Sequence, residues 1–466
     1  MKRKNNFLNK LLIFSAVALV STLGISKLWA APRVYLTGTT IYDPSKAYNS
    51  YVLFGAPDGN THLIDLDGNE VHRWNHWGFP SELLDPKVTG GKLGHVLVQL
   101  SSDGKDVWGG IFHNKTVGEL DWDGNTVWEW GEQAPGGAAR QNHDWHRLPN
   151  GDTLLDVTVV HPIKELDNRD IADQAIYEVT PDGKIVWKWV AGDHLSEFGI
   201  SPEGIAYLKK QLLRGDNAPQ KGSGFLTINK FNVVGPNHWF DAGDKRFNPD
   251  NILLDSRNAN FIVIIDRQTG RVVWRLGPDY PQVKSSKVPR PADQISGQHD
   301  AHIIPEGLPG AGDLLVFDNQ GSAGWPPVAL IGGSRVLEIN PVTKQIVWQY
   351  TGENSGRPIW SFQSHFISSA RRLPNGNTLI DEGRDGRFFQ VTPTGEIVWE
   401  YVNPYVNQPH DGWDQSGQGV IVNWVYRAQP VPYDWVPAGT PHSENPVTEP
   451  DVTKLQASGH KKFWLF

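Results

Sequence analysis

The chain has 466 residues and a formal net charge of −8, and it contains 20 Trp, 48 Gly and 33 Pro but no Cys. The absence of Cys excludes disulfides, thiolate metal ligands and a cysteine nucleophile. Beyond its first residues the chain is acidic and has no runs of Lys or Arg, so it is a poor match for nucleic acid or an anionic membrane surface. The many Trp and Gly residues favour short strands joined by tight turns over a helical protein.

Residues 1–31 have the pattern of a signal peptide. A basic segment at 2–10 precedes an apolar stretch at 11–25, and the small residues Ala30 and Ala31 offer a cleavage site. The apolar stretch is short for a membrane span. We therefore expect export to the periplasm, with an uncleaved signal anchor in the inner membrane as the alternative. Cleavage removes five basic residues, which moves the formal charge from −8 to −13 (38 basic minus 51 acidic residues).

One turn-and-strand unit recurs six times along the rest of the chain. Each copy is a turn, usually containing Gly, followed by an alternating strand with Val at its centre. The copies are LDGNEVHRW (66–74), WDGNTVWEW (122–130), PDGKIVWKW (181–189), QTGRVVWRL (268–276), VTKQIVWQY (342–350) and PTGEIVWEY (393–401). The shared aromatic position holds Trp128, Trp187, Trp274, Trp348 and Trp399, with His72 in the first copy.

Other strands recur beside these copies. More apolar strands such as LPNGDTLLDV (148–157) precede them, and a further strand such as NFIVIIDR (260–267) lies between the two. Four-stranded units repeated in this way are typical of a β-propeller. The sequence therefore predicts an all-β fold, a six-bladed β-propeller over residues 32–436, with the repeated Trp residues buried between blades.

Two segments depart from the repeat. Residues 201–216 have a helical pattern, with Ser201 as the N-cap, Pro202 at the first helical position and Gly215 as the terminator, so we expect a small helical insertion. Residues 437–466 begin with a stretch rich in Pro, Ser, Thr and Glu, which predicts a flexible C-terminal tail.

Histidines cluster at one phase of the repeat, just before the strand that we expect to come first in a blade. The first strand of each blade lines the central channel of a propeller, so these side chains should converge at one mouth of the channel. The residues concerned are His143, His146, His238, His299 with its neighbour Asp300, and His365, while His410 follows the sixth repeat.

Such a cluster has two functional interpretations and one structural one. It could hold a metal ion, although no HxH, HxxxH or HExxH spacing occurs on a favourable element. One imidazole could instead act as a nucleophile while others, with Arg257, bind an anion. In the structural alternative, the histidines only fasten loops to the blades.

Three segments resemble the bacterial arylsulfotransferases: residues 142–155 (NHDWHRLPNGDTLL), 251–277 and 297–321 (GQHDAHIIPEGLPGAGDLLVFDNQG). The similarity extends from about residue 38 to residue 434. It implies an exported propeller enzyme, without cofactor or metal, that moves a sulfuryl group from an aryl sulfate ester to a phenolic acceptor through a sulfated histidine. By motif, His299 would be the nucleophile, supported by His143, His238 and Arg257. We expect His365, His146 and Asp300 to contact substrate near the mouth.

Two other functions stay open at this stage. The Val-Trp turns also resemble those of quinoprotein dehydrogenases, which usually have eight blades, and a non-enzymatic binding or scaffold propeller would carry the same repeats. The oligomeric state is open as well.

Overall fold

The computed structural model describes residues 36–102, 114–213, 224–278, 295–327, 332–408 and 421–449. The signal segment at 1–31, Gly215 and His410 lie outside these ranges. No helix within them is long and apolar enough to cross a membrane.

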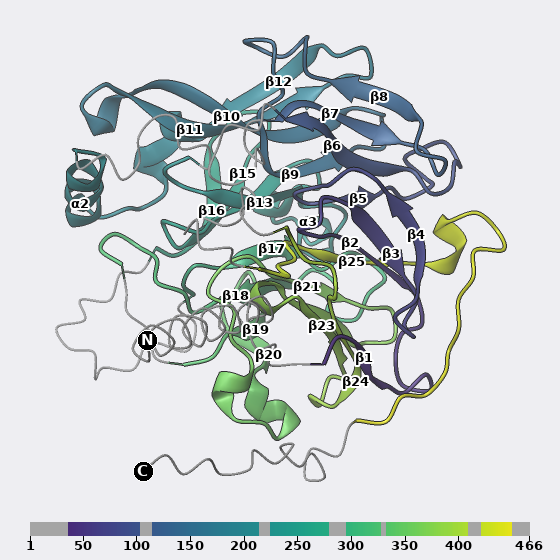
Figure 1. Ribbon diagram of the computed structural model, residues 1–466. Coiled ribbons are helices and arrows are strands. Elements are labelled where there is room, and N and C mark those ends of the chain that lie inside the picture. The colour runs from purple at the N-terminus through teal and green to yellow at the C-terminus, as the bar shows by residue number, and fades with distance from the viewer. Residues whose placement is uncertain are drawn as a thin grey trace, which may run out of the picture.

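Six antiparallel sheets lie around a common centre, and the chain runs from one sheet to the next around the ring (Figure 1). The predicted six-bladed β-propeller is therefore confirmed. In order from the first strand outward, the blades are: blade 1, β25 (Ala428–Val431), β2 (Tyr51–Gly55), β3 (Thr61–Ile64) and β4 (Glu70–Trp74); blade 2, β5 (Glu82–Leu83), β6 (Val96–Ser102), β7 (Asn114–Leu120) and β8 (Thr126–Trp130); blade 3, β9 (Gln141–Arg147), β10 (Thr153–Ile163), β11 (Arg169–Val179) and β12 (Ile185–Val190); blade 4, β13 (Ile228–Val233), β14 (Ile252–Ser256), β15 (Phe261–Ile265) and β16 (Val272–Leu276); blade 5, β17 (His299–Ile303), β18 (Leu314–Asp318), β19 (Arg335–Ile339) and β20 (Ile346–Tyr350); and blade 6, β21 (Ser369–Arg372), β22 (Thr378–Glu382), β23 (Arg387–Val391) and β24 (Ile397–Val402).

Both ends of the chain close the ring. The late strand β25 supplies the first strand of blade 1, where it pairs with β2. The early strand β1 (Gly38–Tyr42) adds a fifth strand to the outer edge of blade 6, where it pairs with β24. Closure by two separate strand pairings ties the N-terminal and C-terminal regions into neighbouring blades, and no edge of the ring is left open there.

The repeated Trp residues join neighbouring blades, as predicted, but only two of the five are buried. Trp274 and Trp399 are 4% and 0% exposed, and each donates its indole N–H to a backbone carbonyl of the next blade. The other three lie half-buried at the blade rims because each indole stacks under a guanidinium group: Arg147 covers Trp128, Arg267 covers Trp187, and Arg372 covers Trp348.

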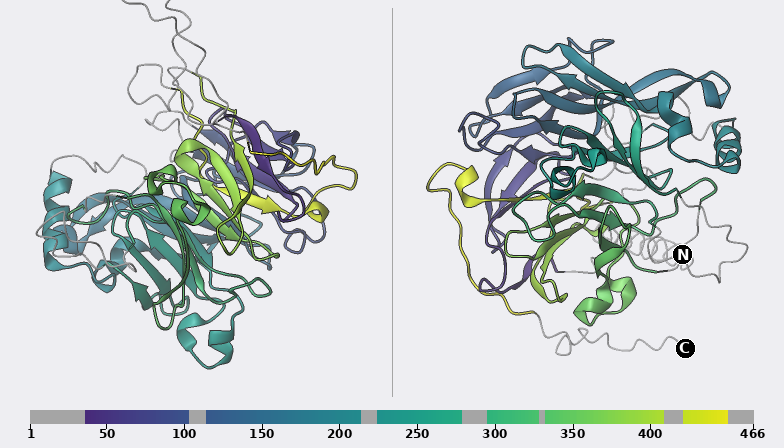
Figure 2. Two further views of the ribbon diagram at one scale, coloured as in Figure 1. Left: turned by 90° about the horizontal axis from the view of Figure 1, so that it is seen from below. Right: turned by 180° about the vertical axis from the view of Figure 1, so that it is seen from behind.

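The helical insertion is present as α2 (Pro202–Leu213), which lies at the periphery of the ring in Figures 1 and 2. The Ser201 hydroxyl accepts a hydrogen bond from the N–H of Gly204 at 3.0 Å, which confirms the predicted N-cap. Leu208 packs into the core beneath the helix, next to the long hairpin of β10 and β11.

The remaining helices are short, and part of the C-terminal tail contacts the ring. Val447 pairs with Tyr42 of β1 through two backbone hydrogen bonds of 2.8 and 2.9 Å. The short helices are η2 (Lys164–Leu166), η3 (Ala191–Glu197), α3 (His238–Asp241), η4 (Lys245–Phe247), η5 (Gly352–Ser355), η6 (Ile359–Ser361), η7 (Gly383–Asp385) and η8 (Tyr433–Trp435).

The first strands of the blades contact one another around the central axis. This corrects one detail of the sequence interpretation. The apolar strand at 314–318 was expected to come first in its blade, but it is the second strand, β18, and the histidine-bearing segment 299–303 is itself the first strand, β17. His143 and His146 likewise lie within the first strand β9 of blade 3. These histidines are therefore part of the channel wall rather than of loops above it.

Candidate active site

Six side chains form one level near the start of the first strands. When the six first strands are aligned by the residues with which they pair on the second strands, these side chains occupy equivalent positions in the six blades. The members are Phe79, His143, Asn229, His299, Ser368 and Tyr426, and their contacts confirm that several of them meet. The Tyr426 ring stacks on Phe79 at a centroid distance of 4.0 Å and lies 5.8 Å from His143 and 6.4 Å from His299.

His299 lies at the first position of β17 and is 3% exposed. Its Nδ1 is 2.7 Å from Oδ1 of Asn319 and 3.0 Å from the carbonyl oxygen of Gly297, and its Nε2 accepts a hydrogen bond from the backbone N–H of Ile367 at 3.0 Å. Burial, followed by the positive charge of Arg257, lowers the pKa of His299 to about 3. The imidazole is therefore neutral at physiological pH, as an attacking nitrogen must be.

His143 is the second histidine of this level. It lies in β9, it is 6% exposed, and its ring is 5.5 Å from that of Phe79. Burial and the nearby His299 hold the pKa of His143 well below its usual range, which the Asp144 carboxylate only partly offsets. A neutral imidazole carries one ring N–H, so His143 can donate a hydrogen bond to an oxygen atom of a ligand bound beside His299.

Arg257 follows β14 and supplies the positive charge of the site. Its guanidinium lowers the pKa of both His143 and His299, which places it close to the two rings. Its hydrogen bonds go to neutral acceptors, Oδ1 of Asn258 at 3.1 Å and the carbonyl oxygen of His365 at 3.5 Å. Within the described ranges it forms no ion pair with a carboxylate. Burial lowers the pKa of Arg257, but an arginine remains charged at physiological pH. A guanidinium held in this way, beside two neutral histidines, is suited to an anion.

An aromatic wall borders the two histidines on one side. Tyr426 and Phe79 are buried together with Ile367, and the Tyr426 hydroxyl donates a hydrogen bond to the backbone carbonyl of Asn229. Three partly buried aromatic side chains pack against this group: Trp77, Phe366 and Trp424. The wall offers flat apolar surface next to the anion-binding groups.

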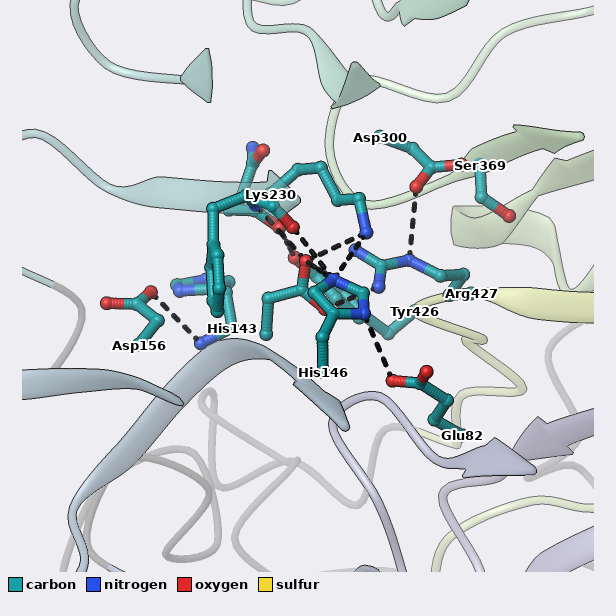
Figure 3. Close-up of polar contacts among 12 residues, drawn as sticks. Glu82, His143, His146, Asp156, Lys230, Asp300, Ser369, Tyr426 and Arg427 are labelled. Atoms are coloured by element: carbon teal, nitrogen blue, oxygen red, sulfur yellow. Dashed lines mark hydrogen bonds and ion pairs between the residues drawn. The ribbon is translucent and has the colours of Figure 1, made fainter. Parts of the chain in front are cut away.

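A buried network of charges fills the channel at the next level (Figure 3). Asp144 contacts Nζ of Lys230 at 3.0 Å and Nη1 of Arg427 at 2.7 Å, and Nε of Arg427 lies 3.3 Å from Asp300. Nη2 of Arg371 contacts the same carboxylate oxygen of Asp300, Oδ1, at 2.7 Å. In the part of the chain that the structure describes, each of these buried cations pairs with a carboxylate and Arg257 does not, so the network supports the floor of the site without neutralising Arg257.

Asp300 and His146 belong to this network rather than to the mouth. Asp300 faces Arg371 and Arg427 and accepts the backbone N–H of Ala370, so the group that orients His299 is Asn319 rather than Asp300. His146 contacts Asp144, Lys230 and Glu82 deeper in the channel (Figure 3). Burial and Lys230 lower the pKa of His146, but the two carboxylates outweigh them and raise it.

The other two predicted histidines lie at different places. His365 is exposed at the mouth, where its carbonyl oxygen approaches Arg257. His238 lies in α3, after the end of β13, and its ring packs against Gly312 in the loop between β17 and β18. That loop is at the opposite end of the channel from His299, so the expected convergence of His238 with the other histidines is wrong. Asn229 occupies the corresponding position in blade 4.

Sequence reasoning did not identify four contributors to the site: Tyr426, Phe79, Asn229 and Asn319. The search for repeated histidines could not find them, because equivalent positions of different blades hold different residue types. Aligning the first strands by their pairing with the second strands would have found the first three. In the described ranges, no group of three or more His, Asp or Glu side chains is arranged to hold a metal ion.

Comparisons with known proteins bear on the fold and the family. No curated protein matches the chain. A protein of unknown function from Bacteroides caccae has 14% identity and a TM-score of 0.44, covering 82% of this chain and 99% of its own. A putative 6-phosphogluconolactonase from Bacteroides fragilis has 10% identity and a TM-score of 0.38, covering 82% of this chain and 98% of its own. At this level of similarity neither structure bears on the reaction.

The family model described as Arylsulfotransferase (ASST) matches residues 94–404. The matched region runs from blade 2 to the end of blade 6 and contains His143, Arg257, His299 and Asn319. Because it spans more than half of the 466 residues, the protein belongs to the arylsulfotransferase family.

Proposed function

We propose that the protein transfers a sulfuryl group from an aryl sulfate ester to a phenolic acceptor through a sulfated His299. The observation that supports this most directly is the pairing of a neutral, buried imidazole with the guanidinium of Arg257, whose hydrogen bonds to the described residues go to neutral acceptors. A sulfate ester carries one negative charge over three oxygens, so the N–H groups of Arg257 and His143 can bind it while Nε2 of His299 approaches the sulfur.

The aromatic wall gives this chemistry its specificity for aryl groups. Tyr426 lies beside both histidines and Phe79 lies beside His143, so an aryl group bound there would meet aromatic side chains. One wall serves donor and acceptor in turn, because the first phenol leaves before the second binds. Ping-pong kinetics follow from such a covalent intermediate.

Incubation with 4-nitrophenyl sulfate alone tests the mechanism. About one equivalent of nitrophenol per enzyme should appear in a fast phase, leaving a protein with one added sulfuryl group. Peptide mapping at neutral or alkaline pH should place the group on His299, and His299→Ala should abolish both the burst and the adduct. His143→Ala should slow the burst without moving the label. Sulfuryl transfer that proceeds without any protein adduct would exclude the covalent mechanism.

We further propose that the enzyme works in the periplasm after removal of residues 1–30 or 1–31. The basic and apolar segments at the N-terminus support this. Intact-mass measurement of the exported protein tests it, and an unprocessed N-terminus would favour the signal anchor.

A further inference from the structure

The side chain of Asn319 lies directly behind His299. Asn319 is the first residue after β18 and is fully buried. Its Nδ2 donates hydrogen bonds to the carbonyl oxygens of Ser364 at 2.7 Å and Ile367 at 2.8 Å. Because the amide nitrogen is committed to these two carbonyls, the amide oxygen faces Nδ1 of His299 at 2.7 Å. An amide oxygen can only accept a hydrogen bond, so Nδ1 carries the ring proton.

Two further contacts require the same tautomer. The carbonyl oxygen of Gly297 lies 3.0 Å from Nδ1 and also needs a proton there. The backbone N–H of Ile367 points at Nε2 at 3.0 Å and needs a lone pair on that nitrogen. All three neighbours therefore place the proton on Nδ1 and leave Nε2 with its lone pair.

We propose that Asn319 is a positioning residue that keeps the proton of His299 on Nδ1 and presents Nε2 as the atom that attacks sulfur. The proposal rests on the sulfotransferase function proposed above. Asn319 and Arg257 occupy corresponding places, each directly after the second strand of its blade, in the neighbouring blades 5 and 4. One orients the nucleophile and the other faces the anion.

The transfer balances with the proton fixed on Nδ1. Nε2 forms a bond to sulfur as the bond between sulfur and the aryl oxygen breaks, and the phenolate leaves with the electron pair. The sulfated ring is then a cation whose Nδ1–H still donates to Asn319. In the second step the acceptor oxygen bonds to sulfur as the bond between sulfur and Nε2 breaks, and the electron pair returns to Nε2. The phenolic proton of the acceptor passes to water, which balances the phenolate released to water in the first step. Nε2 must exchange the N–H of Ile367 for sulfur, so this hydrogen bond breaks when the donor reacts.

The neutrality of Asn319 matters as much as its geometry. Among the described residues, the charged and titratable groups that face His299 are the guanidinium groups of Arg257 and Arg427, the imidazole of His143 and the phenol of Tyr426. An amide orients the ring without adding charge. A carboxylate at position 319 would place a negative charge against Nδ1, and a close opposite charge raises the pKa of a histidine by about 1–3 units.

The tautomer can be measured without substrate. Nitrogen-15 NMR of the full-length protein labelled at its histidines distinguishes protonated from unprotonated ring nitrogens, and His299→Gln assigns the His299 signals. We expect a protonated Nδ1 and an unprotonated Nε2 from pH 5 to pH 8. A proton on Nε2 would overturn the proposal, whatever the enzyme transfers.

Two variants then test the effect on catalysis. Asn319→Ala should slow the burst by roughly 10- to 100-fold at every pH, as loss of an orienting partner does elsewhere, while the dissociation constant for the donor stays the same. Asn319→Asp should make the burst pH-dependent, slow at acid pH and faster as pH rises, with protonation of Nε2 seen over the same range. Asn377→Ala is the matched control, because Asn377 is a buried asparagine whose side chain donates a hydrogen bond to the carbonyl oxygen of Lys46, outside the site.

The outcomes separate the two proposals. A wild-type burst with a wild-type pH profile in both Asn319 variants would show that Asn319 is only structural. Failure of the wild-type protein to form any adduct would remove the covalent mechanism, while the NMR response of His299 to Asn319→Asp would still decide whether Asn319 controls the ring.

Discussion

Replacement of Arg257 by Met separates the stability of the free protein from its affinity for an anion. The guanidinium makes two hydrogen bonds to neutral acceptors and is desolvated beside two imidazoles. Each neutral bond contributes about 0.5–1.5 kcal/mol net, and the desolvation of the charge offsets part of this. We therefore expect Arg257→Met to change the free energy of unfolding by about 1 kcal/mol or less.

The effect on the reaction should be far larger. Two charge-assisted hydrogen bonds to the sulfuryl oxygens contribute about 1.5–3 kcal/mol each, or about 3–6 kcal/mol together. At about 1.4 kcal/mol per factor of ten, the burst rate should fall by roughly 10²- to 10⁴-fold. Arg257→Lys should recover only a small part of this, because an ammonium keeps the charge but loses the planar pair of N–H donors.

Stopped-flow measurement of the nitrophenol burst gives the rate, and thermal unfolding with and without sodium sulfate gives anion binding. Sulfate at 100 times its dissociation constant should stabilise the wild-type protein by about 2.7 kcal/mol, and Arg257→Met should lose most of this. Arg246→Met is the control, since Arg246 is a partly exposed arginine paired with Asp244 outside the site. A wild-type burst rate in Arg257→Met would refute the anion site.

Four more predictions rest on burial and charge. Because the pKa of His299 is about 3, the burst rate of the wild-type enzyme should stay level between pH 5 and pH 8, whereas a fall centred near 6.5, the ordinary histidine value, would show that the ring is not desolvated. Because the pKa of His299 is about 3 in the folded protein, only the unfolded chain binds a proton at this residue between about pH 6.5 and pH 3. The free energy of unfolding should therefore fall by about 1.4 kcal/mol per pH unit over this range as pH falls. In chemical denaturation at several pH values, His299→Gln should lose less stability per pH unit than wild type. Arg427→Met should destabilise the protein by about 3–5 kcal/mol in urea, since it leaves the buried carboxylates of Asp144 and Asp300 short of a partner, and wild-type stability would contradict the network. Trp399→Ala should cost about 3–5 kcal/mol because this fully buried indole joins blade 6 to blade 1, and a smaller loss would show that β1 and β25 alone close the ring.

The blades could be predicted from the sequence because their outer strands carry the repeat. Val and Trp at fixed spacing in strands such as 185–190 and 397–402 pack between blades in every copy, so the same residue types return. The prediction that all five Trp residues are buried was too strong. Trp128 and the other two half-buried Trp residues lie under guanidinium groups. Each arginine belongs to the following blade, so the sequence of the Trp-bearing strand does not indicate that it is there.

The first strands could not be recognised in the same way, because they line a channel filled with charges. Segment 228–233 reads INKFNV, with Asn229 and Lys230 buried although they are polar, so hydrophobic periodicity assigns it to a loop. The prediction therefore took His238 as the contribution of blade 4, although the corresponding residue, Asn229, lies nine residues earlier. A polar residue is buried where the fold supplies it with a hydrogen-bonding partner, here Asp144 for Lys230 and Gln298 for Asn229. These partners come from other blades, so the local sequence does not reveal them.

The same reasoning explains why His299 was found and its orienting group was not. His299 stands in a motif with an adjacent carboxylate, Asp300, which the sequence prediction placed among the substrate contacts. The pairing of β17 with β18 is irregular between His299 and His302, and Asp300 has a positive φ of 58°, so its carboxylate lies at the next level of the channel, towards Arg371 and Arg427. The group that does meet the ring lies twenty residues later, where β18 ends beside the start of β17. In an antiparallel hairpin the end of the second strand lies opposite the start of the first, so Asn319 reaches His299 through strand pairing that no local motif records. A neutral amide delivered by the backbone in this way orients the ring without adding a charge, while burial and Arg257 keep the pKa of His299 low and the ring neutral, as the proposed attack on a sulfate ester requires.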